Sequence, residues 1–179
     1  MASEGPLSGA TFADDATVGT VAWNTPGNAA ASDDTDSSAI LVASAVSHYL
    51  KATNFGFAIP AGATIDGIVV EWEVAKTTGG TVDNAARIVK GGTIGSTDKS
   101  SVTAWTGTDT YLSHGGVSDL WGETWTADDI NATTFGSALS AVNADPSFVD
   151  NPTIDHVRIT VYYTEAATGR SRMSTLMCG

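Results

Sequence analysis

Three histidines are the side chains in this sequence around which a catalytic site would have to be built. His48 follows Ser47 in a predicted strand, where adjacent side chains face opposite ways, so the two cannot form a nucleophile and its base. His114 falls in a predicted loop and His156 opens the last predicted strand, and nothing in the sequence places either beside a serine and an aspartate. The G-x-S-x-G and H-E-x-x-H motifs are also missing. We therefore expect structural histidines in a protein that is not an enzyme.

The acidic residues offer two further kinds of chemistry. Glu71 and Glu73 share one face of a predicted strand, about 7 Å apart, a spacing that glycosidases use across a cleft. On a single strand, the pair is better explained as the solvated face of a sheet. Asp33, Asp34 and Asp36 could supply oxygen ligands to Ca²⁺, but the Gly and Glu of an EF-hand loop are missing, and aspartate clusters are common in turns. Divalent-cation binding is left open, and no cofactor is expected.

A segment rich in loop residues contains three tryptophans, Trp105, Trp121 and Trp125. Exposed aromatic rings could form a sugar-binding surface. Alternatively, the three rings could cap the core and be buried, which is the commoner situation for tryptophan. The sequence therefore leaves both a glycan-binding and a structural role open for these residues.

The composition restricts the partners of the protein. Twenty Asp and Glu residues against eight Lys and Arg give a formal charge of −12 and a pI of about 4.2. Nucleic-acid binding needs clustered cations, and an anionic membrane surface would repel an acidic protein, so neither partner is expected. The N-terminal stretch lacks the basic and apolar regions of a signal peptide, and we expect synthesis in a cytoplasm. The single cysteine, Cys178, cannot form a disulfide framework within the chain.

Alternating hydrophobic residues predict β-strands along most of the chain. In residues 64–76, Ile68, Val70, Trp72 and Val74 share one face, which is the pattern of a half-buried antiparallel strand. Eight or nine such short segments at even spacing predict an all-β, single-domain antiparallel β-sandwich, and a jelly roll is the expected arrangement. The order of the strands cannot be derived. One helical turn is expected after Thr126, a suitable N-cap residue.

Three parts are expected: an extended N-terminal arm over residues 1–17, the β-sandwich domain over residues 18–165, and a C-terminal tail over residues 166–179. The tail is basic and apolar on an acidic body, so we expect it to dock onto a neighbour rather than fray. Its candidate partner-binding residues are Arg170, Arg172, Met173, Leu176 and Met177.

Four segments of the chain resemble a group of small β-sandwich proteins found in tailed bacteriophages. They are "SHYLKATNFGFAIPAGATIDGIVVEWE", "RIVKGGTIG", "DLWGETWTADDINATTFG" and "DHVRITVYYT", and the resemblance spans residues 42–164. It implies a virion structural protein without catalytic residues, such as a capsid decoration (cement) protein or a fibre component.

The expected partners are then other copies of the chain, with a trimer as the working expectation, and the major capsid protein. The expected location is the capsid surface of the virion, after synthesis in the bacterial host cytoplasm. The alternative is a glycan-binding module of a tail or head fibre, in which Trp105, Trp121 or Trp125 contacts the sugar.

Overall fold

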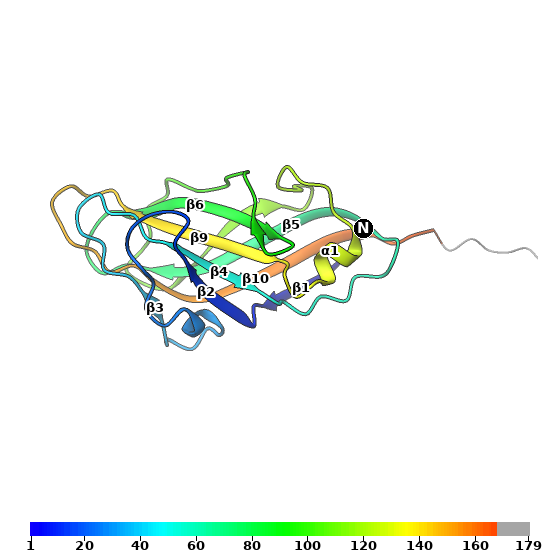
Figure 1. The fold of residues 1–179 in the computed structure, drawn as a ribbon, viewed down its shortest axis with the longest axis horizontal. Helices are drawn as coiled ribbons and strands as arrows, with labels where there is room; N and C mark the ends of the chain where they lie inside the picture. The colour runs from blue at the N-terminus through cyan, green and yellow to red at the C-terminus, as the bar shows by residue number, and fades with distance from the viewer. Residues whose placement is uncertain (168–179) are drawn as a thin grey trace, which may run out of the picture.

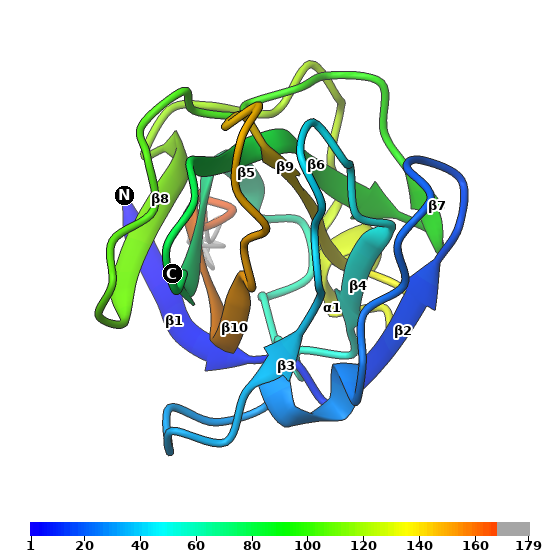
Figure 2. The same cartoon turned by 90° about the vertical axis from the view of Figure 1, so that its left-hand side faces the viewer.

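The computed structural model describes residues 1–167, which form two curled antiparallel sheets packed face to face (Figures 1 and 2). The first sheet has the order β1 (Ala2–Ser8), β10 (Thr153–Thr164), β5 (Thr64–Ala75) and β8 (Thr110–Gly116), and β3 (Ser37–Ser38) pairs with one end of β10. The second has the order β2 (Thr11–Asp15), β4 (Tyr49–Thr53), β9 (Gly136–Asn143), β6 (Thr81–Lys90) and β7 (Thr93–Ile94). Two short helices complete the fold, the 3₁₀ helix η1 (Pro26–Ala29) and α1 (Ala127–Asn131).

The strand order is that of a jelly roll. If β1 and β4 to β10 are numbered one to eight along the chain, the first sheet runs 1-8-3-6 and the second 2-7-4-5. This interleaving of two Greek keys defines the jelly roll, and β2 and β3 are additions to it. The predicted β-sandwich and its jelly-roll arrangement are therefore confirmed.

The core lies between the two inner faces. On β5, the predicted inward residues Ile68, Val70, Trp72 and Val74 are all buried, and β5 pairs along almost its whole length with β10. Three phenylalanines close the core near one end, where Phe135 makes edge contacts with Phe55 and Phe57. Alternation along each strand is thus what gives the sandwich its apolar interior.

Residues 1–17 do not form the separate extended arm that was expected, because residues 2–15 are part of the sandwich. Ala2–Ser8 pairs with β10 at the edge of one sheet, and Thr11–Asp15 pairs with β4 at the edge of the other. The chain crosses between the sheets at Gly9 and Ala10, and Leu7 and Phe12 pack against the core. The segment is held to the sandwich by backbone hydrogen bonds at both sheet edges and by the packing of these two side chains. Its polar composition alone had suggested an arm.

The molecule is elongated along its strands and has two distinct ends. One end carries the loops 39–45 and 144–150, which meet at the Leu41–Asp150 bridge. At the other end, Ala2 lies opposite Tyr163, so the start of β1 and the end of β10 are neighbours (Figure 1). No helix among residues 1–167 is long and apolar enough to cross a membrane.

Candidate functional site

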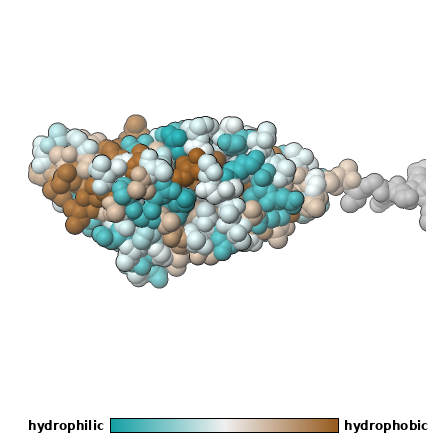
Figure 3. All heavy atoms as spheres, in the orientation of Figure 1, coloured by the Kyte–Doolittle hydropathy of each residue, from teal (hydrophilic) through white to brown (hydrophobic). Residues whose placement is uncertain are grey.

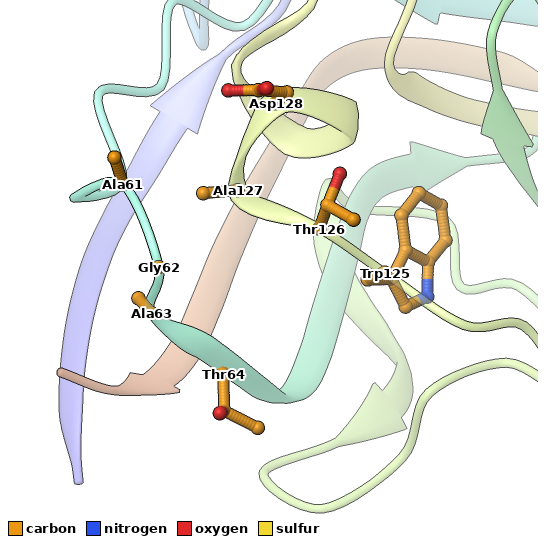
Figure 4. A pocket seen from close by; sticks show the side chains of 8 residues that line it. All are labelled: Ala61, Gly62, Ala63, Thr64, Trp125, Thr126, Ala127 and Asp128. Atoms are coloured by element: carbon orange, nitrogen blue, oxygen red, sulfur yellow. The ribbon is translucent and has the colours of Figure 1, made fainter. Parts of the chain in front are cut away.

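A pocket of about 370 Å³ lies at the end of the sandwich where β10 finishes (Figure 4). One wall is the turn that leads into β5, from Ala61 to Thr64, and the other runs from Trp125 to Asp128 at the start of α1. The turn contains Gly62 with a φ of +76°, and the amide of Ala63 donates to the carbonyl of Pro60 (3.1 Å). The pocket thus combines a partly exposed indole, two hydroxyl groups and a carboxylate, which are groups that can contact a sugar.

The pocket wall is held by a well-ordered helix start. Thr126 and Asp129 form a capping box, in which the Asp129 amide donates to Thr126 Oγ1 (3.1 Å) and the Thr126 amide donates to Asp129 Oδ2 (2.9 Å). Burial raises the pKa of Asp129. The hydrogen bonds from Thr126 and the nearby Lys90 ammonium lower the same pKa by more, so the net shift is downward. The predicted helical turn at Thr126 is confirmed.

Trp125 is fixed in this wall by contacts on several sides. Its Nε1 donates to the carbonyl of Leu120 (2.9 Å), its ring meets Phe135 edge-on, and Lys90 Nζ lies 5.2 Å from the ring centroid. The indole is only half-buried, so part of its surface remains available at the pocket.

Trp105 and Trp121 are not available to a ligand, because each is only 1% exposed. Trp105 Nε1 donates to Asp83 Oδ1 (2.9 Å), and Trp121 Nε1 donates to the carbonyl of Ile68 (3.0 Å). Two of the three candidate glycan-binding residues therefore belong to the core, and the structure does not bring them together with Trp125 in one surface.

Each histidine has a hydrogen-bonded partner. His114 lies in β8 rather than in the predicted loop, and its Nε2–H donates to Asp83 Oδ2 (2.8 Å) inside the core. His48 Nδ1 lies 2.7 Å from Asp14 Oδ2. His156 bonds to Ser8 through Nε2 (2.7 Å) and to Tyr111 through Nδ1 (2.8 Å).

The Ser8–His156–Tyr111 contact is the nearest approach to a nucleophile and base. Burial lowers the pKa of His156, which favours the neutral ring. Its other partner is a tyrosine hydroxyl, where a triad of the serine-hydrolase type has a carboxylate. The three side chains come from β1, β10 and β8, across the outer face of one sheet, where they tie the edge strand β1 to its neighbour.

The predicted carboxylate cluster is crowded rather than arranged around an ion. The amide of Asp34 donates to Asp155 Oδ2 (3.3 Å). The pKa of Asp36 is raised by burial and by Asp109, and that of Asp155 is raised by burial and by Glu73. Within residues 1–167, no three His, Cys, Asp or Glu side chains are placed to hold a metal ion together.

The most conspicuous surface feature lies at the opposite end from the pocket. Four large apolar residues on the two loops that meet there have more than half of their surface exposed, and we call them the apolar tip. They are Ile40 (62%), Val42 (58%), Phe148 (61%) and Val149 (53%). Figure 3 shows hydrophobic residues gathered at this end of the molecule. Large exposed apolar patches on a soluble protein generally mark interaction sites.

Sequence reasoning missed the apolar tip. Between β3 and β4, the residues of the first tip loop form only the isolated Leu41 bridge, so the loop has no extended strand of its own. The sequence feature that could have indicated it is the pair Phe148–Val149 between Pro146 and Pro152. Prolines on both sides indicate a loop, and large apolar residues in a loop are not part of a strand that packs in the core. The candidate tail residues, from Arg170 to Met177, lie outside the described residues.

Comparison with known proteins gives one structural likeness. No protein-family model and no curated protein matches the chain. Among solved structures, the chain is similar to a carbohydrate-binding module described as "CBM4 structure and function", with 16% sequence identity and a TM-score of 0.42 over 83% of this chain and 92% of that one. A likeness this distant carries no argument about the function or the ligand of this chain.

Proposed function

We propose that this protein is a non-enzymatic structural protein of a bacteriophage virion, a capsid decoration protein that assembles on the particle surface. The observation that carries the proposal is the apolar tip on an otherwise acidic molecule. A formal charge of −12 favours solubility and disfavours contact with packaged DNA, while the tip offers one defined place for association.

The fold suits this role. A jelly roll closes a core between two sheets, and here β1 and β2, from one continuous segment, form one edge strand of each sheet. Such a unit, with its core closed within one chain, is suited to repetition in a surface lattice. The resemblance of residues 42–164 to small β-sandwich virion proteins also supports the proposal, with other copies of the chain and the major capsid protein as the expected partners.

Immunogold electron microscopy of purified particles tests the proposal. Antibody raised against recombinant residues 1–167 should label the whole head densely, and antibody preabsorbed with the same protein should leave the particles unlabelled. Label confined to the tail would contradict the decoration role while keeping a virion role. Particles without any label, from a preparation in which immunoblots detect the protein only in the unassembled fraction, would overturn the proposal.

A second candidate function is glycan binding in the pocket beside Trp125. It is favoured by a pocket whose lining includes this half-buried indole together with Thr64, Thr126 and Asp128 (Figure 4). Aromatic faces with nearby polar groups are suited to sugar rings, and a fibre module would use such a pocket on host polysaccharide.

Titration calorimetry with polysaccharide extracted from the host surface separates this function from the first. Trp125→Ala should abolish any heat of binding, whereas the control Val102→Ala, at a 93% exposed position in another loop, should leave it unchanged. Equal binding by Trp125→Ala and the unaltered protein would rule out this pocket, as would the absence of any heat with the unaltered protein.

A further inference from the structure

We propose that the apolar tip of one copy binds residues 168–179 of a second copy, so that the chain assembles head to tail. The inference rests on the proposed assembly function and names the two surfaces that would meet. The tip would receive Met173, Leu176 and Met177, and the Asp145 carboxylate beside it would face Arg170 and Arg172.

The tip is a preformed surface. The amide of Leu41 donates to the carbonyl of Asp150, and the amide of Asp150 donates to the carbonyl of Leu41, each at 2.9 Å. Both of these side chains are buried, so the neighbouring residue on each loop, Val42 and Val149, faces outward beside its counterpart. A surface held on paired backbone loses little freedom on binding, which favours association.

The loops under the tip are anchored by the Asp150 carboxylate. Its Oδ2 accepts from Thr81 Oγ1 (2.6 Å), and its Oδ1 accepts from the amides of Thr78 (3.1 Å) and Asn151 (2.9 Å). Phe148 is held from behind, because Asn143 Nδ2 donates to its carbonyl (2.8 Å). The apolar side chains are therefore presented to solvent by a rigid base rather than by a loose loop.

The length of β10 separates the tip from the place where residues 168–179 begin. Between Thr153 and Thr164 the strand rises by about 36 Å, at about 3.3 Å per residue. The tip lies at the Thr153 end, beyond the strand (Figure 1). Met177, the last of the three apolar residues, is ten residues past Ala167 and can extend about 36 Å from it at most. Ala166 lies beside Gly62, beyond the Thr164 end of β10, so even Met177 falls short of the tip of its own copy, and the occupant we propose comes from another copy.

The two surfaces are complementary in charge and polarity. Residues 168–179 contain two arginines and no acid, so the remaining 167 residues carry −14, which is −12 minus 2. The Asp145 carboxylate accepts from the amide of Ser147 (2.8 Å), so a negative charge lies beside Phe148 on the tip loop. Methionine is also well suited to an irregular apolar surface.

Such a contact is heterologous, because two different patches of the chain meet. Repetition closes into a ring when the rotation between copies allows it and otherwise continues as a filament. Each interior copy would use both surfaces, while removal of either surface would stop growth at that end.

A complementation experiment tests the inference. The full chain should self-associate with rising concentration in analytical ultracentrifugation. Phe148→Lys, which removes tip surface and repels the arginines, and a chain ending at Ala167 should each remain monomeric. The matched control Val102→Lys, at an exposed valine away from the tip, should associate as the unaltered chain does. Circular dichroism melts establish that every variant is folded.

Mixing the two defective variants gives the decisive reading. Phe148→Lys retains residues 168–179, and the shortened chain retains the tip, so an equimolar mixture should form dimers and nothing larger. The inference is overturned if the unaltered chain stays monomeric, if Phe148→Lys associates like Val102→Lys, or if the mixture remains monomeric. If the chain stays monomeric but the antibody still labels particles, the head-to-tail contact is refuted and the virion role stands. If the chain self-associates but particles carry no label, the virion role is refuted and the head-to-tail contact stands.

Discussion

His114 Nε2 lies 2.8 Å from Asp83 Oδ2, and this contact joins the two sheets inside the core. Asp83 belongs to β6 in one sheet and His114 to β8 in the other, and both side chains are almost fully buried. Asp83 also accepts from Trp105 Nε1 (2.9 Å) and from the amide of Ser101 (2.9 Å). One carboxylate therefore fixes a strand, a loop and a tryptophan at the same time.

Replacing Asp83 with alanine should destabilise the protein by about 3–5 kcal/mol, because it leaves two buried donors, on Trp105 and His114, and the part-buried amide of Ser101 without an acceptor. The free energy of unfolding from urea titration measures the effect. Asp109→Ala, at an exposed position, serves as the control and should change stability by no more than about 0.5 kcal/mol. A similar small change for both variants would show that the buried contact contributes little.

Asp150→Asn should destabilise the protein at neutral pH and lose this effect in acid. Burial raises the pKa of Asp150, but the hydrogen bonds from Thr81 and three backbone amides lower it far more, well below its usual range. The unfolded state therefore binds the proton more readily, so the stabilisation is present above about pH 4 and is lost as the pH falls. We expect a cost of about 1–3 kcal/mol at pH 7, measured by urea titration between pH 2 and 7. A cost that is independent of pH would contradict the role of the charge.

Gly62→Val should weaken the turn before β5. Gly62 has a φ of +76°, which costs a side-chain-bearing residue about 1–2 kcal/mol, and a β-branched residue at least that much. Thermal melts should show a clear loss for Gly62→Val and little change for Ala61→Val, the exposed neighbour. Equal melting temperatures for the two variants would mean that the turn adapts to the side chain.

The three tryptophans of the loop-rich segment should differ sharply in their contribution to folding. Trp121→Ala should cost about 3–5 kcal/mol, because it empties a fully buried site and removes the hydrogen bond to Ile68. Trp125→Ala should cost less, because its ring is only half-buried. Urea titration of both variants measures the difference, and a larger loss for Trp125→Ala would contradict the burial pattern.

The sandwich was predictable because local alternation is strong in the central strands. In β5 and β10, hydrophobic residues recur at every second position, and both strands are buried on one face as expected. The helical turn after Thr126 was predictable for a similarly local reason, since a threonine cap and first-turn aspartates act within four residues.

The edge strands and the burial of the tryptophans depend on contacts that are distant in sequence. Ala2–Ser8 has no alternating pattern and is a strand because β10 supplies backbone partners about 155 residues later. Trp105 is buried because Asp83 receives its indole N–H, and the apolar tip exists because Leu41 pairs with Asp150. Neither relationship can be read from the residues nearby.

The pairing of Ala2 with Tyr163 has a practical consequence, because it makes the two ends of the molecule separately addressable. A fluorophore attached at residue 1 will sit where β10 finishes, while a short peptide inserted after Pro146 will be displayed among the residues of the apolar tip. Accessibility of the two labels to antibody then reports the orientation of the protein on whatever surface carries it.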